Sequence, residues 1–240
     1  MRTTRSAAAL VSAALAATAS VLALAGCVPT IVAGPMSSEE REIDAVTIVV
    51  LDTAGDLSIS EGAPGLVIHA PEGALARLTS EVDGETLVLG TTPGPEIVVG
   101  DVRYELTLPE LAAIDLNGSG DVDATVSGSG PIRLDLDGSG DVEWTGLETE
   151  RVEVVLAGSG EIEISGSATE LSIQLEGSGN VDASDLQAQT ADVSIAGSGD
   201  IDVSVRDDLV AGISGSGRVT YSGDPSVESD VTGSGDVVRE

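Results

Sequence analysis

Apolar and polar residues alternate along most of this chain, and a longer period is superimposed on that alternation. The tripeptide GSG occurs seven times in phase between residues 118 and 235, at intervals of 18 to 20 residues, and an out-of-phase copy lies at 128–130. The second and fourth residues on each side of GSG are apolar with few exceptions. A period of two is typical of a strand with one buried face. Each repeat therefore predicts one strand before GSG and one strand after it.

When the repeats are aligned on GSG, their apolar positions form columns. The column two residues before the tripeptide contains Leu116, Leu136, Leu156, Leu175, Ile195, Ile213 and Val231. The column two residues after it contains Val122, Val142, Ile162, Val181, Ile201, Val219 and Val237. Coils stacked at the strand spacing of ~4.8 Å would turn each column into an interior ladder. The pattern thus predicts an all-β fold, a right-handed parallel β-helix (β-solenoid) with coils of about 20 residues and GSG corners.

The GSG tripeptides are expected to be structural corners and not binding loops. Glycine accepts a close backbone approach or a positive φ without a Cβ clash, and serine can bond to main-chain groups in a turn. A phosphate-binding loop needs a following helix and usually a lysine, and this chain has no lysine. A β-sandwich would share the alternation of apolar residues but would not explain the near-constant period.

The first 26 residues have the layout of a secretory signal peptide. Two arginines precede a long apolar run of small and branched residues, and the run ends in LAGC at positions 24–27. This tetrapeptide resembles a bacterial lipobox, which implies cleavage before Cys27, the only cysteine, and its acylation. Several acyl chains would hold the protein at a membrane surface. We therefore assign residues 1–26 to a lipoprotein signal peptide and residues 27–42 to the lipidated cysteine and a tether.

Residues 43–240 are expected to form one solenoid domain. The GSG repeats occupy residues 111–240. Residues 43–110 lack GSG, but alternating segments separated by turn sequences such as EGAPG and TTPGPE predict strands there too. An open solenoid end exposes strand edges and core residues, so solenoids need caps. We expect residues 43–110 to begin the solenoid irregularly and to cap its N-terminal end.

The segment YELTLPEL at 104–111, followed by a series of GSGD corners behind a lipoprotein signal, resembles the GIN-domain (DUF2807) family, whose members are described as auto-transporter adhesin heads. The resemblance covers residues 43 to 238. It implies a right-handed β-helix related in shape to pectin-lyase-like folds, no established catalytic residues, and a role in adhesion to a protein or glycan at the cell surface. Because function resides in sites and not in folds, the adhesion role needs its own evidence.

The net charge of −31 excludes one class of partner and suggests another. The chain has 41 acidic residues against 10 arginines. Such a field repels phosphate backbones, so we expect no nucleic-acid binding. Two acidic columns follow GSG and face outward if the residues between them face inward, and their candidate metal ligands are Asp121, Asp123, Asp141, Glu143, Glu161, Glu163, Asp200 and Asp202. Stacked carboxylates repel, and a hard divalent ion such as Ca²⁺ would relieve that repulsion. The repeat length differs, however, from that of known nine-residue Ca²⁺-binding coils.

Catalytic chemistry has little support in the sequence. The chain has one histidine, His69, with no serine and aspartate pattern around it. Histidine and cysteine ligands for zinc are lacking. Arg218 stands in the first acidic column, where we expect it to neutralise Asp200 or Asp236. The aromatic residues Trp144 and Tyr221 fall in inward columns, which predicts core positions and not a sugar-binding platform.

The sequence as a whole predicts an extracytoplasmic lipoprotein, anchored to the outer face of the cell membrane, with a non-enzymatic surface-adhesion or interaction module and no cofactor. One alternative is a divalent-cation-dependent binding protein that uses the acidic ladders with Ca²⁺. A second alternative is a degenerate polysaccharide-active β-helix. The identity of a partner does not follow from the residues.

Overall fold

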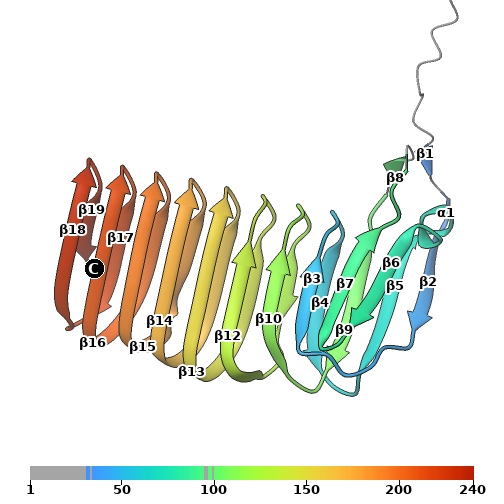
Figure 1. The fold of residues 1–240 in the computed structure, drawn as a ribbon, viewed down its shortest axis with the longest axis horizontal. Helices are drawn as coiled ribbons and strands as arrows, with labels where there is room; N and C mark the ends of the chain where they lie inside the picture. Colours follow the sequence, from blue (N-terminus) through green and yellow to red (C-terminus); the bar gives the residue numbers. More distant parts are fainter. Residues whose placement is uncertain (1–30, 33, 95–96, 99) are drawn as a thin grey trace, which may run out of the picture.

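A computed structural model describes residues 31–240, apart from residues 33, 95–96 and 99. The described residues form a parallel β-solenoid of about six turns, and 72% of these residues are in strands (Figure 1). The signal peptide and Cys27 predicted from the sequence lie outside the described residues. Among the residues that are described, no helix has the length and apolar character needed to cross a bilayer.

The regular coils follow the GSG repeats. Their strands are β10 (Leu111–Leu116), β11 (Val122–Ala124), β12 (Gly128–Leu136), β13 (Val142–Gly158), β14 (Glu161–Gly177), β15 (Asn180–Gly197), β16 (Asp200–Gly215), β17 (Arg218–Gly223), β18 (Ser226–Gly233) and β19 (Asp236–Arg239). Neighbouring coils pair in parallel with like positions opposite, as in Leu136 opposite Leu156 and Val142 opposite Ile162. Each of the strands β13 to β16 runs from one GSG corner to the next. At the second turn of the coil, the pairing with the neighbouring strand shifts in register but does not end. The predicted parallel β-helix with GSG corners is confirmed.

The first coil lacks GSG and is placed between two layers of later strands. It consists of β3 (Ile48–Leu51) and β4 (Asp56–Glu61). These strands pair in parallel with β10 and β11 on one side and with β7 (Thr86–Thr91) and β9 (Arg103–Leu108) on the other. The order of the coils in space therefore differs from their order in the chain at this end.

Antiparallel strands cover the N-terminal end of the solenoid (Figure 1). The strand β5 (Gly65–Pro71) pairs with β2 (Met36–Arg41) and with β9. A second antiparallel pair joins β6 (Leu78–Asp83) to β7. The remaining elements here are the helix α1 (Glu72–Leu75) and the short parallel pair β1 (Ile31–Val32) and β8 (Ile97–Val98). Most of these elements fall within residues 43–110, the segment that we expected to cap the solenoid, whereas β1 and β2 come before residue 43.

The core is built from aliphatic ladders together with two buried aromatic residues, Trp144 and Tyr104. Leu134 and Leu136 are 1% exposed, Val142 is 2% exposed and Trp144 is fully buried. The indole N–H of Trp144 donates to the carbonyl oxygen of Val126 at 3.0 Å, so the large ring enters the core without an unpaired donor. Tyr221 packs against the same core but is only partly buried. The inward position predicted for both aromatic residues is confirmed, completely for Trp144 and partly for Tyr221.

Candidate functional site

The GSG corners are used in stacking one coil on the next. A Cβ added to Gly138 would lie 2.1 Å from the carbonyl oxygen of Gly118, which no side chain can tolerate. The main-chain N–H of Ser159 donates to the carbonyl oxygen of Gly138 at 3.2 Å, and the later corners repeat this bond. The corner glycines are therefore required by close backbone contact, and the tripeptides act as corners as predicted.

The first acidic column has a structural role that the sequence pattern did not reveal. Asp141 Oδ1 accepts a hydrogen bond from the main-chain N–H of Glu161 at 2.9 Å, and Asp121 Oδ1 accepts one from Asp141 at 3.1 Å. Asn180 and Asp200 do the same for the following coils, at 3.2 and 3.0 Å. Each of these side chains therefore satisfies a main-chain donor just after the corner of the next coil.

The two exceptions in this column follow from side-chain chemistry. Above Glu161, the N–H of Asn180 donates to the carbonyl oxygen of Gly160 at 3.1 Å. Above Arg218, the N–H of Asp236 donates to the carbonyl oxygen of Gly217 at 3.2 Å. Glutamate is one methylene longer than aspartate, and arginine has no acceptor. The hydrogen bond from a side chain of this column to the main chain of the next coil therefore forms only where the column residue is Asp or Asn, whose acceptor side chains are short.

The second acidic column stacks carboxylates without such bonds between coils. Within its own coil, Asp182 Oδ1 accepts hydrogen bonds from the main-chain N–H and the hydroxyl of Ser184, at 2.9 and 2.6 Å. Strand pairing places Asp123 opposite Glu143, then Glu163, Asp182 and Asp202 in successive coils. Desolvation, followed by the negative charges of Glu143 and Asp182, raises the pKa of Glu163 above its ordinary value. The repulsion expected from the sequence is therefore present on this face of the solenoid.

The candidate metal ligands lie on the outside but do not converge. Each coil contributes its carboxylates in columns that run along the solenoid, and in the described part of the chain no group of three or more His, Cys, Asp or Glu residues is close enough to hold a metal ion. Strand pairing places Arg218 opposite Asp200 and Asp236, the two residues that we expected it to neutralise. Its main-chain N–H donates to Asp200 Oδ1 at 3.0 Å, and its guanidinium makes no direct ion pair with the described residues.

Ion pairs between coils lie instead on the sheet that precedes the corners. Arg133 contacts Asp135 at 2.7 Å and Glu153 of the next coil at 2.8 Å. Arg151 pairs in the same way with Glu170. Burial and then the charge of Asp135 raise the pKa of Asp115, while Arg133 lowers it. The arginines thus offset part of the acidic repulsion on this sheet.

The structure brings Ser38 and Glu105 together on either side of His69. Ser38 Oγ lies 2.8 Å from His69 Nδ1, and Glu105 Oε1 lies 3.2 Å from His69 Nε2. The residues come from β2, β5 and β9, so their separation in the chain hid the arrangement from sequence analysis. A serine, an imidazole and a carboxylate are the groups of a nucleophilic triad. Here, however, Ser38 is exposed and the Glu105 side chain is 65% exposed, so the group lies open to water on an outer sheet face.

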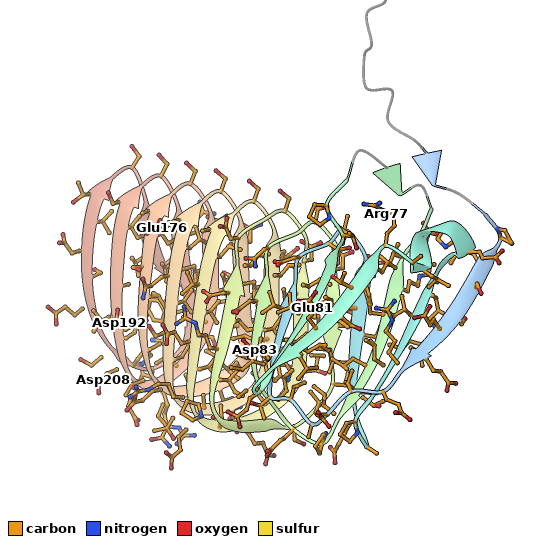
Figure 2. All side chains as sticks on the ribbon, turned by 45° about the vertical axis from the view of Figure 1, so that its right-hand side comes forward. Arg77, Glu81, Asp83, Glu176, Asp192 and Asp208 are labelled. Atoms are coloured by element: carbon orange, nitrogen blue, oxygen red, sulfur yellow. The ribbon has the colours of Figure 1, made fainter. Side chains whose placement is uncertain are left out.

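A cleft of about 540 Å³ lies where the N-terminal antiparallel strands meet the first corners. Arg77, labelled in Figure 2, reaches its rim and donates to the carbonyl oxygen of Thr92. Asp52, which also lines the cleft, accepts a hydrogen bond from Asn117 Nδ2 at 2.7 Å. The side chains of Arg77 and Asp52 are therefore already hydrogen-bonded to other parts of the chain.

Comparison with known proteins agrees with this architecture. A family model described as "Putative auto-transporter adhesin, head GIN domain" (DUF2807) matches residues 47–225. The chain belongs to this family. The GIN-domain match includes the antiparallel strands β5 to β7 and the coils up to β17, and the resemblance inferred from YELTLPEL and the GSGD corners is confirmed. Membership suggests a surface-adhesion module in an extracytoplasmic setting.

Solved structures share the fold. A "putative adhesin" from Bacteroides fragilis NCTC 9343 is 22% identical, with a TM-score of 0.82 over 88% of this chain and 99% of that one. A "putative adhesin" from Parabacteroides merdae ATCC 43184 is 20% identical, with a TM-score of 0.66 over the same shares. A "Putative lipid binding protein" from Parabacteroides distasonis ATCC 8503 is 23% identical, with a TM-score of 0.67 and the same coverage. A comparison with curated protein sequences found no match.

Proposed function

We propose that this GIN-domain chain is a lipoprotein anchored through Cys27 to the outer face of the cell membrane, where its solenoid acts as a non-enzymatic adhesion or interaction module. The match of the adhesin-head family model over residues 47–225 carries the proposal. The partner would be a protein or glycan at the cell surface.

The shape of the solenoid supports a presenting role. The first described strand, β1, and the last coil, β18 and β19, lie at opposite ends of the longest axis (Figure 1). An anchor at Cys27, four residues before β1, would therefore hold one end near the membrane. Among the described coils, the one formed by β18 and β19 would then lie furthest from the lipid and be well placed to meet a partner.

The use of the repeated residues supports a non-enzymatic role. The corner glycines and the first acidic column serve stacking between coils. The group of Ser38, His69 and Glu105 lies exposed, without the water-excluded setting in which oxyanion stabilisation is strong. A screen of acidic and neutral polysaccharides is expected to give no product release. Turnover that His69→Ala abolishes would instead favour the polysaccharide-active alternative.

The anchor and the adhesion role can be tested separately. Metabolic labelling with a fatty-acid analogue is expected to label the wild type and not Cys27→Ala, and equal labelling would refute the anchor. Crosslinking on living cells is then expected to join the wild-type protein to a surface partner. Cells that express Cys27→Ala are the matched control, because the solenoid is unchanged while its attachment is lost.

A divalent-cation-dependent binding protein remains the alternative function. The raised pKa of Glu163, due in part to Glu143 and Asp182, supports an attraction for cations at the second column. Against it, no three carboxylates of the described residues converge on one point. We therefore favour diffuse cation attraction over a coordinating site.

A further inference from the structure

The strand β18 forms an uncovered edge at the C-terminal end of the described solenoid. It pairs with β16 on one side, and none of the described residues pairs with it on the other. Strand N–H and C=O groups point alternately to the two sides, so those not bonded to β16 face solvent. An eight-residue strand with such an edge is a template for a further strand.

The inward side chains of β18 are also uncovered. Val227 and Val231 are 38% and 40% exposed, whereas Leu209 and Ile213, opposite them on β16, are 0% and 3% exposed. The difference arises because each inner coil has a neighbour on both sides. One additional strand would place side chains over Val227 and Val231 and complete the two ladders.

Of the features that usually prevent edge pairing, the strand has only outward charges, Glu228 and Asp230. Lysine, proline, a bulge or an inward charge blunts a natural edge. The sequence of β18, SVESDVTG, contains no lysine or proline, and its inward residues are Val227, Ser229 and Val231. The other edge strand of the coil, β19, does carry such a feature, because Arg239 occupies the inward column opposite Tyr221 and pairs with Asp224 at 3.2 Å. Docking is therefore favoured at β18 and not at β19.

The charge around this edge selects the partner. The outward residues Glu228 and Asp230 are exposed, and the chain has a net charge of −31. A second copy would bring like charges together at the edge, which is destabilising. A strand with basic residues opposite Glu228 and Asp230 would form favourable cross-strand pairs instead.

We propose that β18 is a docking edge for an extended segment of a partner protein in which apolar residues alternate with lysine or arginine. The segment adds a strand to the solenoid, with its apolar residues over Val227 and Val231. This inference rests on the proposed function as an interaction module and names the chemistry of its partner. Under the proposed anchor, the edge lies at the end of the solenoid away from the membrane.

The test is a fluorescence-anisotropy titration of the purified full-length protein with a synthetic peptide of alternating valine and lysine. We expect saturable binding that weakens at least tenfold in the double variant Val227→Lys, Val231→Lys, which places two inward charges on the edge. The matched control is Ser167→Lys, Gln187→Lys, which adds the same charge on exposed positions of inner coils in a column that does not reach β18, and we expect it to change the affinity less than threefold. Circular dichroism of both variants verifies the fold.

A second peptide separates strand pairing from simple charge attraction. Methylation of alternate peptide nitrogens removes ladder donors and leaves the charge unchanged, so we expect it to abolish binding. Equal binding of the methylated peptide, or equal weakening by both double variants, would overturn the proposal. A dimer in sedimentation that only the β18 variant dissociates would also overturn it, in favour of pairing between copies. If peptide docking fails while crosslinking on cells still depends on the anchor, the edge assignment is wrong and the adhesion role stands.

Discussion

Asp141 Oδ1 accepts a hydrogen bond from the main-chain N–H of Glu161, one coil further along the solenoid, at 2.9 Å. The side chain of one repeat thereby satisfies the backbone of the next. The acidic column after the corners is in this respect part of the stacking mechanism, and the carboxylates of Asp121, Asp141 and Asp200 each already accept a hydrogen bond on one oxygen.

Replacement of Asp141 should therefore weaken the junction between two coils. We expect Asp141→Ala to lower the free energy of unfolding by about 1 kcal/mol, because the N–H of Glu161 loses its acceptor. Asp141→Asn should retain most of the stability, since Asn180 already makes the same bond to Asp200. Chemical denaturation measures both. Glu161→Ala is the control, because the main-chain N–H of Asn180 in the next coil bonds to the carbonyl oxygen of Gly160 and not to Glu161. A loss of stability equal to that of Asp141→Ala would contradict the stabilising role of the Asp141 side chain.

The corner glycines should tolerate no side chain. In Gly158→Ala the new Cβ would lie 2.1 Å from the carbonyl oxygen of Gly138, so we expect a loss of at least about 2 kcal/mol from forced backbone displacement. Gly212→Ala is a matched control in the same solenoid, since nothing lies within 4 Å of its Cβ, and it should change the stability by less than ~1 kcal/mol. Thermal melting compares the two, and similar melting temperatures would show that the corners can relax.

The charge of Glu163 should oppose folding at neutral pH. Its pKa is raised in the folded chain, so the folded state binds its proton more readily than the unfolded state, and stability falls as the pH rises through the folded-state pKa. We expect Glu163→Gln to stabilise the protein at pH 7 by a few tenths of a kcal/mol (~0.3 kcal/mol), as is typical of an exposed like-charge contact. The gain in stability should disappear below a pH of about 4, which is the ordinary pKa of a glutamate in the unfolded chain. Melting curves of Glu163→Gln and the wild type across this pH range test the prediction. A gain in stability that is independent of pH would rule out the charge of Glu163 as its cause.

Calcium should act on the protein through ionic screening. Because no three described carboxylates converge, we expect Ca²⁺ and Mg²⁺ at equal concentration to raise the melting temperature equally, by relief of repulsion within the acidic columns. Calorimetric titration should show no saturable heat. A specific shift with Ca²⁺ that Glu143→Gln and Glu163→Gln remove would instead establish the cation-dependent alternative.

The sequence by itself determined the strands, the corners and the inward columns. Leu136, Val142 and Trp144 could be assigned to the core from their positions relative to GSG, because parallel stacking of near-identical coils places like residues on like. The repeat is local, and its period can be read directly from the chain. The GIN-domain resemblance could likewise be recognised from a few contiguous motifs.

Only the tertiary structure decided the features that depend on contacts between distant segments. The placement of β3 and β4 between two later layers and the meeting of Ser38, His69 and Glu105 join residues that no local pattern connects. The repeat did place Asp121 and Asp141 in one column, but their hydrogen bonds to the main chain of the next coil depend on side-chain geometry that the sequence does not give. The exposed edge of β18 is of the same kind. Its valines have the inward pattern of every other coil, and they are exposed only because no described strand lies beyond them.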